Sequence, residues 1–105
     1  MSDIRIRREH DLGLDVARAV ADDWAEQCRT QFDMQCSVRR GESSDTVEFR
    51  RSGVNGRLIV AADHFDLDAK LGFLLGAFSK TIEREIRSNL DQQLARHAGD
   101  AKKRG

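Results

Sequence analysis

The sequence predicts an α+β domain in which an antiparallel five-stranded sheet carries two helices on one face, in the order β-α-β-β-β-β-α. The first observation is the alternation of apolar and polar residues in segments 46–51, 57–61 and 65–71, which is the period of a half-buried strand. The second is a change of period at Leu74, after which apolar residues recur at every fourth position: Phe78, Ile82, Ile86, Leu90 and Leu94. An apolar sheet face and an apolar helix stripe bury each other, so we expect both helices on the same face.

The amino-terminal third predicts one strand and one helix. Ile4 and Ile6 alternate with arginines and indicate a short first strand. After a polar loop, apolar residues return at helical spacing: Val16, Val20, Trp24 and Cys28. Asp15 comes directly before this row and is the expected N-cap, so the helix should extend from there to about Thr30.

The middle of the chain predicts two hairpins. Met34, Cys36 and Val38 share one strand parity, and the polar turn 41–45 should connect them to a third strand over residues 46–51. The next turn, 52–56, contains an Asn-Gly pair, which readily adopts the positive φ angles of a tight hairpin.

The remaining segments complete the sheet and add the second helix. We expect a fourth strand at about 57–61 and a fifth at 65–71. A short helical turn should cover 73–78, with a break near Ser79 and the main helix from about Lys80 to Arg96. Residues 1–97 then form a single domain, and the polar residues 98–105 are expected to be a disordered tail.

Composition narrows the possible functions. Lys and Arg together number 18, as do Asp and Glu, so no overall field attracts nucleic acid. The longest apolar run, 72–78, is far shorter than the ~20 residues of a membrane span. The first residues lack the apolar core of a secretory signal. We therefore expect a cytoplasmic protein with no nucleic-acid partner and no membrane span.

The sequence offers no complete set of catalytic or metal-binding residues. Cys28 and Cys36 have no CxxC spacing, and in a reducing compartment they are expected to be inert, free thiols. His10 and His64 each adjoin an aspartate, but no nucleophile or oxyanion motif accompanies them. We expect no cofactor and no metal, and a protein that is not an enzyme.

Two surfaces are candidates for binding a partner. The sheet face away from the helices should carry these cations: Arg5, Arg7, Arg39, Arg50, Arg57 and Lys70. Glu48, Asp66 and Asp68 share that face, so a solvated mixed-charge surface is the simpler interpretation, and a docking face for an acidic or polar partner or a second copy is the alternative. The other candidate is an apolar patch: Phe73, Leu74, Leu75 and Phe78. For this group, core packing is the simpler interpretation and an exposed patch the alternative.

Four segments carry a family pattern. They are IRIRREHDLGL at 4–14, followed by Ala17-Arg18, then FRRSGVNGRL at 49–58, KLGFLL at 70–75 and IEREI at 82–86. Together they resemble the small polyhydroxyalkanoic acid system family, over Ile4 to about Leu94. The segment from Gln35 to Asp45 is longer and more polar than is usual in that family.

The resemblance implies an accessory protein associated with bacterial polyhydroxyalkanoate storage granules or with their genes, and it supplies no catalytic residues. We therefore expect a non-enzymatic protein that binds the granule surface or a granule-coat protein, with a homodimer permitted by the free sheet edges. The alternative is a small helix-grip-like protein, either an apolar-ligand binder or a minimal enzyme, with a cavity between sheet and last helix. We expect the space there to be filled by large side chains: Trp24, Phe49, Phe65 and Phe78.

Overall fold

The computed structural model describes residues 3–104, apart from the side chains of Leu74 and of residues 98–104. Its elements are β1 (Ile4–Glu9), α1 (Leu14–Gln31), β2 (Gln35–Arg39), β3 (Ser44–Arg51), β4 (Val54–Ala61), β5 (His64–Leu71), α2 (Phe73–Gly76) and α3 (Ser79–Arg104). The five strands form one antiparallel sheet. The predicted fold class and element order are confirmed, with α2 as the single turn expected before the long helix.

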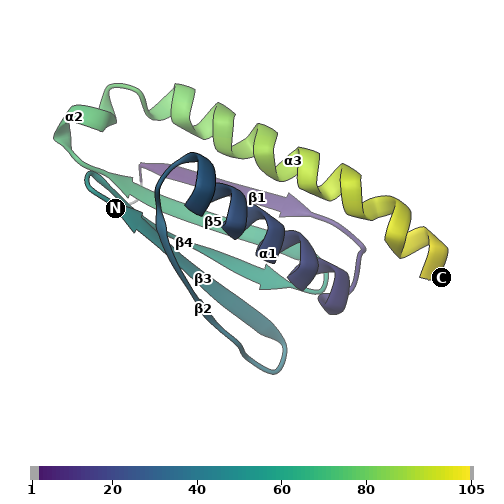
Figure 1. The fold of residues 1–105 in the computed structure, drawn as a ribbon. Helices are drawn as coiled ribbons and strands as arrows, with labels where there is room; N and C mark the ends of the chain where they lie inside the picture. Colours follow the sequence, from purple (N-terminus) through teal and green to yellow (C-terminus); the bar gives the residue numbers. More distant parts are fainter. Residues whose placement is uncertain (1–2, 105) are drawn as a thin grey trace.

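The sheet order is β1-β5-β4-β3-β2. Helix α1 carries the chain from β1 at one edge to β2 at the other, and three hairpins then return it across the sheet to β1 (Figure 1). Both long helices lie on one face. Helix α1 packs over β2, β3 and β4, while α3 lies beside α1 and over β1.

The centre of the core is an aromatic pair between α1 and the sheet. Trp24 and Phe49 are each 1% exposed, and their ring centroids are 5.3 Å apart in an edge-to-face arrangement. Such pairs add about 0.5–1.5 kcal/mol to the gain from burial. Across the hairpin, Phe49 is paired with Gly56. A Cβ atom at Gly56 would lie 2.5 Å from Cζ of Phe49, so only glycine leaves room for the ring.

The stripe along α3 is buried only in its second part. Leu90 and Leu94 belong to the core, Ile82 and Ile86 are partly buried, and Phe78 is 59% exposed. Phe78 precedes α3, in the connection where the chain leaves α2. The expectation that Phe78 fills the space between helix and sheet is therefore wrong.

The β3–β4 turn differs from the prediction. Arg51 pairs with Val54, so the connection is Ser52-Gly53, and Gly53 has the positive φ of 85°. Asn55 and Gly56 lie within β4. The Asn-Gly pair suited a turn locally, but strand pairing with both neighbours places it inside the sheet.

The start of α1 and the end of α3 also differ from the prediction. Helix α1 begins at Leu14 with Gly13 at the N-cap position, and Asp15 lies in the first turn without a capping hydrogen bond. Helix α3 continues to Arg104, beyond the predicted end near Arg96 and through most of the expected disordered tail. Alanine, lysine and arginine in that stretch favour helix, whereas Gly99 and Asp100 oppose it. The last residue of the expected tail, 105, lies outside the described residues.

A buried ion cluster joins the β2–β3 hairpin to α1. Asp45 lies in β3 on the helix side and is 2% exposed, so the predicted turn 41–45 is too long by its last residues. Its carboxylate accepts hydrogen bonds from Arg18 Nε at 2.9 Å, Arg40 Nη1 at 2.8 Å and the Gly41 amide at 3.2 Å. Burial raises the pKa of Asp45, but these hydrogen bonds outweigh that effect and hold the pKa below its usual value.

The Gly56→Ala substitution should lower the free energy of unfolding by about 1–3 kcal/mol, because the new methyl group overpacks Phe49. Urea unfolding monitored by circular dichroism measures the change. Gly76→Ala is the matched control, since no atom lies within 4 Å of the added Cβ. Equal stability of the two variants would contradict the close packing of Phe49 on Gly56.

The Asp45→Asn substitution should cost about 1.5–3 kcal/mol, because the buried side chain loses its charge-assisted hydrogen bonds with Arg18 and Arg40. In the wild type, the contribution of the carboxylate is complete above the unfolded pKa of about 3.9 and is lost as pH falls through the lower folded pKa. Urea unfolding between pH 3 and 7 should therefore show a weaker acid dependence in the variant. Asp66→Asn, on the wet face, should cost less than about 1 kcal/mol, and a similar loss for both variants would contradict this role of Asp45.

Candidate functional site

The sheet face away from the helices is built as the strand parities predicted. Residues paired across antiparallel strands share a face, and one row across the sheet consists of Arg5, Asp68, Arg57, Glu48 and Ser37. A second row holds Arg7, Asp66, Ile59, Thr46 and Arg39, and a third holds Lys70, Asn55, Arg50 and Gln35. The structure thus brings all six predicted cations to one face.

Half of these cations are paired with carboxylates of the same face. Arg57 Nε lies 3.5 Å from Asp68, Arg39 Nη2 lies 3.8 Å from Glu48, and Arg7 Nη1 lies 4.0 Å from Asp66. Exposed pairs of this kind contribute little to stability, but they reduce the charge available to a partner. The other three cations, Arg5, Arg50 and Lys70, form no ion pair within the described part of the chain.

The polar face is hollowed over the middle of β2, β3 and β4. A depression of about 590 Å³ surrounds Gly56 and is bordered by Glu48, Arg50, Arg57 and Asp68. Cations and anions alternate around its rim. This arrangement fits water or a polar ligand and shows no preference for one sign of charge.

The predicted apolar patch divides into exposed and anchoring residues. Phe73 is 98% exposed and Phe78 is 59% exposed, whereas Leu75 is partly buried and packs against the core. A Cβ atom at Gly53 would lie 3.1 Å from Cδ1 of Leu75, which places Leu75 directly on the β3–β4 turn. The Gly72 amide also donates to the Gly53 carbonyl at 2.8 Å. Core packing thus holds for Leu75 and is wrong for the two phenylalanines, while the side chain of Leu74 lies outside the described residues.

We call Phe73 and Phe78 the apolar tip. The tip is at the end of the molecule where α2 connects β5 to α3 (Figure 1). Lys70 near the end of β5 and Lys80 at the start of α3 flank it in the sequence, and both are exposed. The apolar tip is thus an exposed pair of aromatic residues that cations flank in the sequence.

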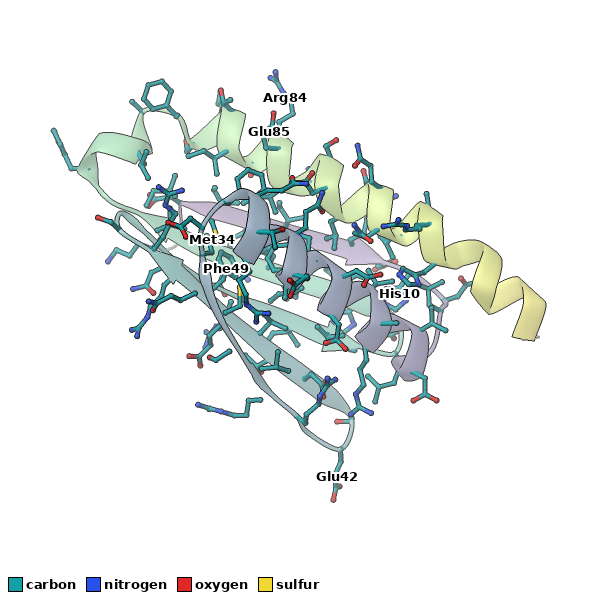
Figure 2. All side chains as sticks on the ribbon, viewed as in Figure 1. His10, Met34, Glu42, Phe49, Arg84 and Glu85 are labelled. Atoms are coloured by element: carbon teal, nitrogen blue, oxygen red, sulfur yellow. The ribbon has the colours of Figure 1, made fainter. Side chains whose placement is uncertain are left out.

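The histidines make local contacts away from the tip. His10, at the opposite end of the sheet in Figure 2, packs its ring on Phe65 at a centroid distance of 4.6 Å. Its Nδ1 accepts a hydrogen bond from the Leu12 amide at 3.1 Å, and burial lowers the pKa of the ring, so His10 is neutral at pH 7. His64 Nδ1 contacts the exposed Asp63 at 2.6 Å. These contacts orient the rings and bring no nucleophile to them.

The cysteines are free, with Cys28 buried and Cys36 partly buried. Burial raises the pKa of the Cys28 thiol to about 12, so the reactive thiolate is scarce at neutral pH. Among the residues that the structure describes, no three histidine, cysteine or acidic side chains are arranged to hold a metal ion.

Sequence reasoning missed Asp45 and Arg18 as a pair. The available signal was parity, because Asp45 falls on the same side of its strand as Val47 and Phe49. A carboxylate in such a position requires a buried cationic partner. The pair stabilises the fold, and its hydrogen bonds leave Asp45 without a role as a base.

None of the described helices is long and apolar enough to cross a membrane. Comparison with curated proteins and with solved structures finds no match for the chain. A family model described as "Putative polyhydroxyalkanoic acid system protein" matches residues 4–94, which span every strand, α1, α2 and the core-packed part of α3. The chain therefore belongs to this family of polyhydroxyalkanoic acid system proteins, as its four sequence segments predicted.

Proposed function

We propose that the protein is a non-enzymatic accessory protein of the polyhydroxyalkanoate storage granule and binds the granule surface through its apolar tip. The observation that carries the proposal is the exposure of two phenylalanines around α2, Phe73 at 98% and Phe78 at 59%. Burial of one such side chain contributes about 1.5–3 kcal/mol. An aliphatic polyester provides an apolar surface on which both rings can be buried, and family membership supplies the connection to that polymer.

The cations near the tip support the same orientation. Lys70, Lys80 and Arg50 are exposed, and Arg50 and Lys70 lie in the sheet row nearest the β3–β4 turn. Apolar side chains flanked by cations are typical of proteins that bind at an interface carrying anionic groups. The rest of the arginine face is a weaker contact, because three of its cations are held by their own carboxylates.

The proposal places the protein in the cytoplasm, on or near granules, and requires no catalysis. The described histidines and cysteines are engaged in packing and local hydrogen bonds. A surface-binding role uses the features that are exposed, and leaves the buried polar groups to stabilise the fold.

The double substitution Phe73→Ser and Phe78→Ser should weaken co-sedimentation with purified granules at least about tenfold, a loss of about 1.4 kcal/mol or more. The reason is that the variant loses the two rings that would be buried on the polymer. Val38→Ser is the matched control, since Val38 is a 39% exposed apolar residue on the edge strand β2. Wild-type sedimentation no better than that of an unrelated protein would overturn the proposal.

The triple substitution Arg39→Glu, Arg50→Glu and Arg57→Glu should weaken sedimentation less than loss of the tip does. Two of these arginines already neutralise carboxylates of the same face. The same co-sedimentation is then measured with protease-treated granules and with bare polyester particles. Binding that disappears with the granule proteins would contradict a polymer-binding tip and would assign the partner as a coat protein.

A further inference from the structure

An apolar cavity of about 280 Å³ lies between the end of α1, the first half of α3 and the sheet. Trp24 and Phe49 form part of its wall, with Leu71 from β5 and with Ile82 and Ile86 from α3. Figure 2 shows two of the lining residues, Met34 and Phe49, close together below the carboxyl-terminal end of α1. Among the described residues of the lining, four have polar or charged side chains: Arg51, Thr81, Glu85 and Asn89.

The cavity exists because only the later turns of α3 pack fully into the core. Its fully buried contacts begin at Leu90, and the residue expected to fill the space, Phe78, is exposed instead. On the sheet side the wall includes Ala69, which is 0% exposed and too small to fill the gap. An apolar cavity costs stability wherever its lining atoms lack packing partners. A ligand that fills it restores those contacts.

The volume limits the size of the ligand. Pockets for drug-sized molecules start at about 300 Å³, and this cavity is slightly smaller. At about 30 Å³ for each group of the size of a water molecule, it holds about nine non-hydrogen atoms. That is the size of one short aliphatic chain with a small head group.

The polar positions determine the charge of that head group. Arg51 comes from β3 and Glu85 from α3, so the lining contains one cation and one anion. Arg51 Nη1 donates a hydrogen bond to the Phe32 carbonyl at 2.8 Å, which fixes the guanidinium at the lining. A carboxylate meets Glu85 as a like charge and an amine meets Arg51, whereas Thr81 and Asn89 both donate and accept hydrogen bonds. An uncharged polar head fits this environment best.

We propose that the cavity binds a single aliphatic chain of about eight carbons with an uncharged polar head, such as an alcohol or a primary amide. The inference rests on the cavity alone and does not depend on granule binding. Trp24 is the only tryptophan of the chain and lies in the cavity wall, so its fluorescence reports occupancy directly.

Titration of the full chain with octan-1-ol and octanamide should give a saturable change in Trp24 fluorescence. Octanoate and octylamine should bind at least about tenfold more weakly. Among alcohols, affinity should rise from butanol to octanol and stop rising by dodecanol, because the volume is used up. The absence of a saturable change with any of these, or affinity that keeps rising with chain length, would overturn the proposal.

Two kinds of variant locate the site. Glu85→Gln removes the anion and should strengthen the binding of octanoate at least threefold. It should not strengthen the binding of octylamine. Glu83→Gln is the matched control, because Glu83 is on the same helix, lies 3.8 Å from Arg87 and is not part of the lining. Ile86→Phe should fill the cavity and weaken octan-1-ol at least about tenfold. Ile82→Phe provides a second filled variant if the first does not fold, and wild-type affinity in a folded filled variant would exclude this cavity as the site.

Discussion

The packing of Phe49 between Trp24 and the backbone at Gly56 sets how closely helix α1 can approach the sheet. The two rings meet edge to face at 5.3 Å, and the missing side chain at Gly56 accommodates the far side of the Phe49 ring. A row of buried alanines lets the rest of α1 lie close to β3 and β4. Since α1 covers the apolar face over β2, β3 and β4, α3 lies beside α1 and over β1.

This division of the apolar face determines what the connection between β5 and α3 must do. The chain leaves the sheet after Leu71, and α2 is fixed on the β3–β4 turn by the Gly72–Gly53 hydrogen bond and by Leu75. Helix α3 begins only after α2. Its first two helical turns lie against the outside of the core, where Ile82 and Ile86 are partly buried. The exposed phenylalanines and the apolar cavity are therefore two results of one geometric requirement.

The sequence predicted the sheet well because strand parity is a local property. Alternation placed Arg57, Asp68 and Glu48 on one face, and the observed register agrees. Features that depend on distant partners were harder to predict. Asp45 resembled a turn residue until Arg18, in another element, was placed beside it. Phe78 continued the helical period, but a period cannot indicate that the helix begins one residue later. The order of the elements suggested a cavity between the sheet and the last helix only by analogy, and large side chains were expected to fill it, because its size depends on how far α3 stands from Ala69.

Leu75 connects the two surfaces physically. Its side chain packs on the turn that holds α2, and it also belongs to the lining of the cavity. A ligand in the proposed site that contacts Leu75 would gain that contact only with α2 on the β3–β4 turn, and would therefore stabilise this position of α2. By linkage, any surface that binds Phe73 in that same position must then favour the ligand to an equal extent. A partner that pulls α2 away from the sheet must have the opposite effect, because it removes one wall of the cavity. The sign of the coupling between tip and cavity therefore distinguishes a docked α2 from a displaced one.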